Sequence, residues 1–385
     1  MSTRRAFLRT TVVAATAATT LGRAADSRPS APAVTPPKSG LIDLHSHWFS
    51  PASVELLSKR AEAPKFTVNA KGERFLQRPG GAAAEGGAGA AAFPLGDQWF
   101  NLDARLAHLD EQGVAHQLIS WPTTLGVDAA ISAEEARPLW AAYNDELAGV
   151  VRKHPRRFSG VATLASADPE WSARELARAH DQLGLIGGVL PVNVFATLEG
   201  AKHFAPVFAA AQKYKSHIYL HTGYGHPGIP GQPPLNKHAD SAGPRGSLDN
   251  IWNFAAATIT FAYSGFLDAY PDVTVQIAQL GGSGGIALVA ELARSAAGRG
   301  PANPGKFDQI YLDTGAGGRG PEAIALAVRV FGADRIVFGT DYAPGPSVAP
   351  VIAAIDRSPL TDAQRRAVFT DTPRRLLASK GVKLA

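Results

Sequence analysis

Two histidines separated by one residue are the first candidates for chemistry in this sequence. His45 and His47 end the short apolar run that begins at Leu41. In a β-strand, residues two apart point to the same face, so both imidazoles would leave one strand side by side. Two adjacent ligands of a metal ion need this arrangement. Because an isolated His-x-His pair is a weak signal, its weight depends on the residues that end the other apolar runs.

Two further apolar runs end in side chains that bind metals. The run from His217 ends at His221, and the run from Ile336 ends at Asp341. Three imidazoles and one carboxylate, completed by water, would suit one divalent ion such as Zn²⁺. Each residue also has an ordinary alternative, because a strand-end histidine often binds backbone groups and Asp341 would serve as a helix N-cap. The sequence contains no cysteine, which excludes disulfides and thiolate metal sites.

Eight short runs rich in Val, Ile and Leu alternate with helical patterns. The runs are Leu41–His47, Val114–Ser120, Phe158–Leu164, Leu185–Pro191, His217–His221, Val273–Gln279, Gln309–Asp313 and Ile336–Asp341. The helical patterns include Asn101–Gln112, Glu134–His154, Glu170–Leu183, Lys202–Lys215 and Leu248–Ala269. This alternation predicts an α/β fold, a (β/α)₈ TIM barrel in one domain, with its functional groups at the C-terminal ends of the strands. A doubly wound sheet is the alternative, but His-Ser-His-Trp stands where its Gly-rich phosphate turn would be.

The N-terminal residues predict export. Arg4 and Arg5, followed by Phe7 and Leu8, match the twin-arginine signal, and a mild apolar run leads to the small-x-small site at residues 22–24. Residues 1–24 are therefore predicted to be a signal peptide for the twin-arginine export machinery. Residues 25–38 would be a Pro/Ser/Ala linker, and residues 39–385 would form the barrel in the periplasm or elsewhere outside the cytoplasm. An uncleaved basic arm or anchor is the alternative.

The charge balance gives no indication of nucleic acid or an anionic membrane as a partner. Of the 38 basic residues, four lie in the first 24 positions, which hold no acid. The rest of the chain carries 34 basic against 33 acidic residues. Such a balance lacks the basic surface that polyanions require.

Two segments are longer than barrel connections need to be. Residues 51–96 contain a low-complexity stretch between Gly80 and Ala92, which predicts a flexible insertion on the catalytic face. The insertion would be either a lid or a tolerated loop. The second segment, Gly223 to Gly246, is dense in Gly, Pro and His, and we expect it to shape the substrate pocket.

Four motifs resemble one family. They are Asp43–His47, Arg105–Val114, Ser264–Asp272 and Gly332–Asp341. The sequence is similar in these motifs to the amidohydrolase superfamily, in the amidohydrolase-related branch that includes aminocarboxymuconate-semialdehyde decarboxylase. The resemblance implies that His45, His47, His221 and Asp341 bind one metal ion. The fourth run, Leu185–Pro191, lacks the lysine that bridges two metals in dinuclear members.

The sixth run departs from the branch. The branch usually ends it with a catalytic histidine, whereas this chain has Gln279. A glutamine amide orients water but does not exchange protons near neutral pH. The possible substitutes for the histidine are His226 and His238, in the loop after the fifth run, and Asp341 itself.

Three arginines and one tryptophan are candidates for substrate binding. The resemblance implies an arginine after the sixth run, for which Arg294 is the nearest position. Arg245 and Arg319 are alternatives, since a guanidinium binds a carboxylate through two hydrogen bonds, and Trp48 would wall the pocket. Surface exposure of the arginines and plain packing of the tryptophan are the ordinary alternatives.

These observations together predict a mononuclear metal-dependent enzyme that acts on a small carboxylic acid. By resemblance we expect a carboxy-lyase of the decarboxylase type. A hydrolase of amide, lactone or ester bonds is the first alternative, and a ligand-binding protein that has lost catalysis is the second. We expect Zn²⁺, with Mn²⁺, Fe²⁺ or Co²⁺ as alternatives because nitrogen and oxygen ligands serve all of them. A homodimer is the expected assembly, by resemblance alone.

Overall fold

The computed structural model describes residues 40–78, 92–234, 240–295, 301–315 and 320–384. The predicted signal peptide and linker, His238 and Arg319 lie outside these ranges. Within the described residues, no helix combines the length and the apolar character that a membrane crossing requires.

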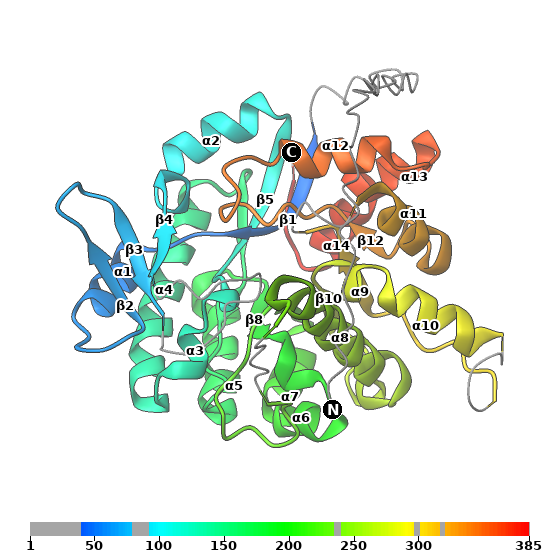
Figure 1. Ribbon diagram of the computed structural model, residues 1–385, viewed down its shortest axis with the longest axis horizontal. Coiled ribbons are helices and arrows are strands. Elements are labelled where there is room, and N and C mark those ends of the chain that lie inside the picture. Colours follow the sequence, from blue (N-terminus) through cyan, green and yellow to red (C-terminus); the bar gives the residue numbers. More distant parts are fainter. Residues whose placement is uncertain (1–39, 79–91, 235–239, 296–300, 316–319, 385) are drawn as a thin grey trace, which may run out of the picture. The chain divides into compact units, whose positions relative to one another are not determined.

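The core of the fold is a closed barrel of parallel strands (Figure 1). The strands are β1 (Leu41–His47), β5 (Val114–Ser120), β6 (Phe158–Gly160), β7 (Ala162–Thr163), β8 (Gly187–Pro191), β9 (His217–His221), β10 (Thr274–Ile277), β11 (Ile310–Asp313) and β12 (Ile336–Val337). Only Val161 separates β6 from β7, so the two form one strand position. Each strand pairs in parallel with the next, and the Leu44 amide closes the ring by donating to the Phe338 carbonyl at 2.8 Å. The predicted barrel is therefore present, with an eight-position ring.

Helices surround the strands (Figure 1). They are α2 (Leu102–Glu111), α3 (Val127–Ala130), α4 (Ala133–Lys153), α5 (Pro169–Arg178), α6 (Leu198–His203), α7 (Ala205–Tyr214), α8 (Ala242–Tyr263), α9 (Leu280–Ser283), α10 (Gly285–Arg294), α11 (Gly320–Phe331), α12 (Ala349–Arg357), α13 (Asp362–Arg366) and α14 (Thr372–Ser379). The expected helix over 202–215 is divided between α6 and α7, and the expected helix over 248–269 begins earlier, at Ala242.

Helix α4 shows how the sequence specifies these elements. Ser132 and Glu135 form a capping box that satisfies amides of the first turn. Trp140, Tyr143 and Leu147 recur at helical spacing and are fully buried. The Trp121 ring, which follows β5, packs 4.8 Å from the Trp140 ring and 5.2 Å from the Tyr143 ring. Large aromatic side chains thus fill the layer between this helix and the barrel.

The low-complexity stretch for which we expected flexibility lies, up to residue 91, outside the described residues. The rest of the segment 51–96 has regular structure. It forms helix α1 (Pro51–Ser58) and an antiparallel sheet of β2 (Lys65–Val68), β3 (Arg74–Gln77) and β4 (Ala92–Leu95). Phe66 and Leu76 face each other across β2 and β3, and both are buried. The strand Lys65–Val68 alternates polar and apolar residues, and buried Phe66, Leu76 and Leu95 give each strand one side chain in the core.

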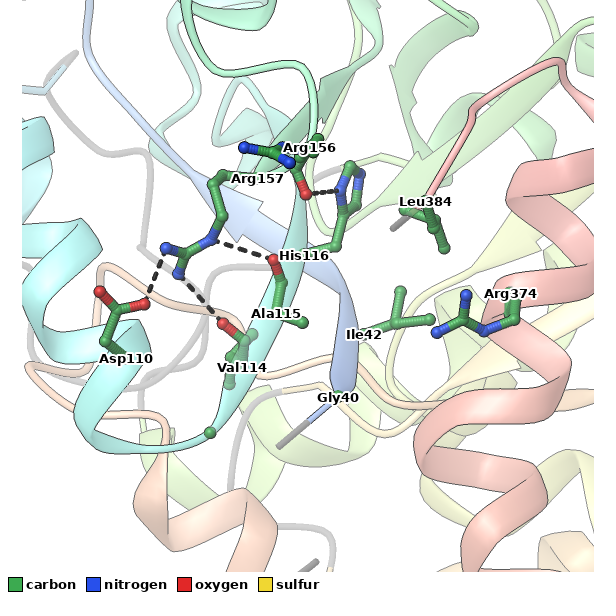
Figure 2. Close-up of a pocket in the computed structure, with 11 residues that line it drawn as sticks. Gly40, Ile42, Asp110, Val114, Ala115, His116, Arg156, Arg157, Arg374 and Leu384 are labelled. Atoms are coloured by element: carbon green, nitrogen blue, oxygen red, sulfur yellow. Dashed lines mark hydrogen bonds and ion pairs between the residues drawn. The ribbon is translucent and has the colours of Figure 1, made fainter. Parts of the chain in front are cut away.

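A cavity of about 410 Å³ lies at the N-terminal ends of the strands (Figure 2). It is lined by Gly40, Ile42, Asp110, Gly113, Val114, Ala115, His116, Arg156, Arg157, Arg374 and Leu384. Arg157 is held in place by Asp110 at 2.7 Å and by the carbonyls of Ala115 and Val114 (Figure 2). About 20 Å of strand separates this end of β1 from His47. The cavity therefore belongs to the end of the barrel that usually serves stability.

His116 is buried beside this cavity in its neutral form. Its Nδ1 lies 3.0 Å from the Arg156 carbonyl, which only accepts, and its Nε2 lies 3.0 Å from the Ser159 hydroxyl. Burial, with the positive charge of Arg157, lowers the pKa of His116 to about 4. In the unfolded chain the pKa of a histidine is about 6.5. The unfolded state therefore binds more protons between pH 6.5 and 4, so acid weakens the folded state.

We predict that His116 makes the free energy of unfolding fall by about 2 kcal/mol between pH 7 and pH 5. Denaturant unfolding at both values should show this loss, and His116→Asn should show a loss smaller by that amount. His203→Asn, at a half-buried histidine outside the barrel, is the control and should keep the wild-type difference. An equal pH dependence in wild type and His116→Asn would contradict the prediction.

Candidate metal centre

The structure brings the four predicted ligands together. His45 and His47 come from β1, His221 ends β9, and Asp341 follows β12. The Nε2 atom of His47 lies 3.2 Å from that of His45 and 3.2 Å from that of His221. Asp341 Oδ1 lies 3.0 Å from His47 Nε2 and 3.2 Å from His45 Nε2. All four ligand atoms are within 4.8 Å of one another.

These spacings fit a single small cation. Nitrogen and oxygen ligands at about 2.0–2.1 Å from a tetrahedral ion lie roughly 3.3 Å from each other. Four of the separations, at 3.0–3.2 Å, are close to that value, and Asp341 Oδ1 lies farther, 3.9 Å, from His221 Nε2. The imidazole rings are fully buried, whereas the Asp341 side chain is 16% exposed. The site is therefore enclosed on the histidine side and open beside the carboxylate.

The other ring nitrogen of each histidine fixes its tautomer. His47 Nδ1 lies 3.2 Å from Ser120 Oγ, and His221 Nδ1 lies 3.0 Å from Thr123 Oγ1. Each hydroxyl donates its own proton to a backbone carbonyl, of Ser46 and Thr222 respectively, so it accepts from the imidazole. The Nδ1 atoms therefore carry the protons, and the Nε2 lone pairs converge as a metal ion requires.

For His45, the tautomer is fixed by Asp313, at the end of β11. Its Oδ1 lies 3.1 Å from His45 Nδ1 and also accepts from the Gly315 amide, while its Oδ2 accepts from Gln276. Sequence reasoning missed Asp313, Ser120 and Thr123. The signal for Asp313 and Ser120 was nevertheless present, because both are the last residues of barrel strands.

The electrostatics of the cluster favour a positive charge. Burial opposes protonation of His45, but Asp313 and Asp341 outweigh it and raise the pKa of His45 to about 10. Burial and the neighbouring His47 and His45 lower the pKa of His221 well below its ordinary value. Two buried carboxylates thus stabilise one cationic charge among three imidazoles, which suits a divalent ion.

Asp43 links the strand that carries His45 to Thr340, the residue before Asp341. Its Oδ1 accepts from the amides of His45 and Thr340, both at 3.0 Å. Its Oδ2 accepts from Gln117 Nε2 at 2.7 Å and from Thr340 Oγ1 at 2.6 Å. Asp341 has a φ of +59°, a left-handed conformation that is costly for aspartate. The braced Thr340 and the bond from the Asp341 amide to the His45 carbonyl, at 2.8 Å, maintain it.

Gln279 lies beside the cluster, and its side chain is neither an acid nor a base. Its backbone amide donates to Asp313 Oδ1 at 3.1 Å, and its Nε2 donates to Thr222 Oγ1 at 3.2 Å. The residue has a φ of +55° and is buried. It therefore braces the neighbours of His45 and His221 and supplies no titratable group.

The other described candidate residues have hydrogen-bond or ion-pair partners outside the four ligands. Arg294 donates to the Val330 carbonyl at the last turn of α10, and its role in binding substrate stays a prediction. Arg245 is exposed and paired with Asp240 at 2.7 Å. The Trp48 indole is buried and donates to the Phe100 carbonyl, as packing requires. Among described residues, His226 Nδ1 accepts from the Gly228 amide, and no hydrogen bond joins it to the cluster.

We predict that Asp313→Asn lowers the affinity for a divalent ion by about 10- to 100-fold, because the carboxylate no longer orients and polarises His45. Competition with a chromogenic chelator for Mn²⁺ and Zn²⁺ measures this directly. Asp334→Asn, on the exposed turn before β12, is the matched control and should bind as the wild type does. Equal affinities in all three proteins would show that Asp313 does not support the site.

The chain is similar in sequence to curated decarboxylases. It is 26% identical to gamma-resorcylate decarboxylase of Rhodococcus jostii (strain RHA1) over 307 residues, which span 71% of this chain and 89% of that protein. It is 30% identical to 2-amino-3-carboxymuconate-6-semialdehyde decarboxylase of Dictyostelium discoideum over 120 residues, 31% of this chain and 33% of that protein.

Solved structures confirm the fold. The 2,6-dihydroxybenzoate decarboxylase from Rhizobium matches 88% of this chain and 99% of its own, with a TM-score of 0.62 and 19% identity. The dihydroxybenzoic acid decarboxylase from Polaromonas, solved with manganese and the inhibitor 2-nitroresorcinol, matches 88% and 97%, with a TM-score of 0.61 and 22% identity. The sequence profile described as amidohydrolase matches residues 42–378, nearly the whole described chain. The chain is therefore a member of the amidohydrolase family, as its motifs predicted.

Proposed function

We propose that this chain is a mononuclear metal-dependent decarboxylase that removes CO₂ from a small aromatic carboxylic acid. The observation that carries the proposal is the cluster of three histidine Nε2 atoms and one carboxylate oxygen, all within 4.8 Å of one another. The curated relatives named above are decarboxylases, which supports carboxyl loss as the reaction.

The roles of the residues follow from their geometry. A divalent ion held by His45, His47, His221 and Asp341 would supply a Lewis acid for the oxygens of the substrate. When the bond to the carboxyl carbon breaks, its electron pair stays on the ring carbon, and one proton must replace CO₂ there. Asp341 is the candidate to relay this proton, because its side chain reaches solvent while its Oδ1 faces the imidazoles. Burial opposes its charge, but His45 and His47 hold the pKa of Asp341 well below its ordinary value, so the carboxylate takes the proton from water as it passes it on. We assign Oδ2 of Asp341 as the atom that delivers it.

Hydrolysis is the weaker candidate for a chemical reason. It requires a base that takes a proton from water and an acid that returns one to the leaving group. Gln279 cannot perform either step. A ligand-binding protein without catalysis is the third candidate. It is favoured by Gln279, which stands where the family branch usually has a histidine.

The identity of the metal is part of the proposal. Nitrogen and oxygen ligands in this number accept Zn²⁺, as the sequence led us to expect, and Mn²⁺ equally. The Polaromonas structure contains manganese. We therefore propose Mn²⁺ or Zn²⁺ as the resident ion.

We predict that protein loaded with Mn²⁺ or Zn²⁺ releases CO₂ from 2,6-dihydroxybenzoate or 5-carboxyvanillate, and that His221→Ala loses both the ion and this activity. Elemental analysis after dialysis and a CO₂ assay measure the two. Hydrolysis of an amide, lactone or ester panel without CO₂ release would favour the hydrolase. Bound metal without either activity, combined with new CO₂ release in Gln279→His, would identify a ligand-binding protein that has lost catalysis.

The place of action is a separate proposal that rests on the sequence. The paired Arg4 and Arg5 and the apolar run behind them support a twin-arginine signal over residues 1–24, followed by a linker over 25–38. The enzyme would then work in the periplasm.

A homodimer is also proposed, with a definite surface. Eight large hydrophobic side chains are exposed among the described residues, and six of them lie on α8 and α10: Leu248, Trp252, Ile259, Leu288, Val289 and Leu292. The two helices contact each other, and we propose that these side chains belong to one apolar area. Monomeric proteins seldom expose such an area, and an apolar patch is complementary to itself across a two-fold axis.

We predict that the wild-type protein is a dimer and that Trp252→Glu is a monomer, because the new charge would be buried in the interface. Light scattering after gel filtration gives both masses. Val68→Glu is the matched control, since Val68 is 60% exposed and lies on β2, away from this area; it should remain dimeric. A monomeric wild type would refute the proposed assembly.

A further inference from the structure

Two polar side chains, His217 and Gln276, are buried in the barrel strands on the N-terminal side of the metal centre. His217 begins β9 and Gln276 is the third residue of β10, with exposed fractions of 1% and 0%. His217 and His221 lie four residues apart on one strand, so they share a face and stand about 13 Å from each other. Buried polar groups need hydrogen-bond partners, and those of His217 and Gln276 lead back to the metal centre.

The neighbours of Gln276 fix the direction of its amide. Its Nε2 lies 2.7 Å from Asp313 Oδ2 and 2.9 Å from the Leu44 carbonyl oxygen. Burial opposes the charge of Asp313, but His45 holds the pKa of this carboxyl below its ordinary value. An ionised carboxylate and a carbonyl only accept hydrogen bonds, so the NH₂ group must face them. Oε1 of Gln276 therefore points the other way and accepts.

His217 is the donor that Oε1 accepts from. Its Nε2 lies 3.1 Å from Gln276 Oε1, so Nε2 carries the proton, and its Nδ1 lies 3.0 Å from the Thr274 hydroxyl, which donates to it. Burial lowers the pKa of His217 to about 3, and the charge of Lys380 adds to this effect. The ring is therefore neutral and has one proton to donate. It holds the amide in the orientation that presents the NH₂ group to Asp313.

These hydrogen bonds form one directed chain that ends at a metal ligand. His217 donates to Gln276, which donates to Asp313 Oδ2. Asp313 Oδ1 in turn accepts from His45 Nδ1 at 3.1 Å. Hydrogen bonds in such a chain polarise one another, and a reversed amide would turn its oxygen toward the carboxylate. We propose that His217 and Gln276 are positioning residues that act through Asp313 and set the affinity and the geometry of the metal centre. This inference rests on the metal site of the proposed function.

The first test replaces the amide in the full-length protein. Gln276→Met keeps a long unbranched side chain but has no group that donates to Asp313. We expect the affinity for Mn²⁺, measured by competition with a chelator, to fall about 10-fold, because outer partners of metal ligands contribute about this much or more. The visible absorption of the protein loaded with Co²⁺ reports the ligand geometry and should shift as well. Neither readout depends on catalysis.

Two variants of His217 test the orientation of the amide. His217→Phe keeps a ring but removes the proton that Gln276 accepts, so the amide is free to reverse and the affinity for Mn²⁺ should fall. His217→Gln supplies an N–H for the same hydrogen bond and should restore the wild-type affinity and Co²⁺ spectrum. If Gln276→Met does not fold, the comparison of these two variants decides the question.

Gln309 provides the matched control for a general loss of stability. Its Nε2 donates to the carbonyls of Tyr270 and Val273 at 2.7 and 2.8 Å. Gln309→Met should therefore lower the melting temperature of the metal-free protein but leave the Mn²⁺ affinity and the Co²⁺ spectrum unchanged. An equal loss of affinity in Gln309→Met and Gln276→Met would overturn the inference.

An unchanged affinity and an unchanged spectrum in Gln276→Met would also overturn it, while the proposed function would stand. A wild type that binds no divalent ion would overturn both, since no metal centre would then exist for these residues to position. The failure of the inference alone is thus distinguishable from the failure of the proposed function.

Discussion

One buried carboxylate joins the first strand of the barrel to the last. Asp43 lies in β1 and accepts four hydrogen bonds, two of them from Thr340 beyond β12. A carboxylate without exposure to solvent needs such a complete set of donors, since each missing donor would leave charge unpaired in a medium of low dielectric. Gln117 in turn accepts from the buried Arg105, so the charge is compensated through one intervening amide. Barrel closure and ligand placement therefore depend on the same group.

The positions of the metal ligands depend on this link between β1 and the residues after β12. His45 and His47 are fixed by β1, and Asp341, itself in a left-handed conformation, follows the braced Thr340. A second layer of hydrogen bonds, from Asp313 and two hydroxyls, then sets the proton positions on the rings. Strand positions determine where the ligands stand, and side chains behind them determine which nitrogen is free. Both levels are needed before an ion can be held.

The sequence was sufficient for the strands and the four ligands because both obey local rules. Apolar runs mark strands, and a ligand at a strand end needs no knowledge of distant residues. Asp313 was missed because its value lies in a contact with His45, 268 positions away. The small sheet of β2, β3 and β4 was not predicted, because low-complexity sequence separates β3 from β4.

Gln279, which follows β10, affects which reactions the site can support. Its amide holds Thr222 and its backbone holds Asp313, so the surroundings of His221 and His45 remain supported without a histidine there. What the substitution removes is one group that exchanges protons. Decarboxylation requires the delivery of a single proton to carbon, whereas hydrolysis requires one transfer from water and another to the leaving group. Asp341, the ligand side chain with solvent exposure, is an ionised carboxylate that can relay the single proton of decarboxylation, whereas Gln279 supplies no second proton-exchanging group for hydrolysis.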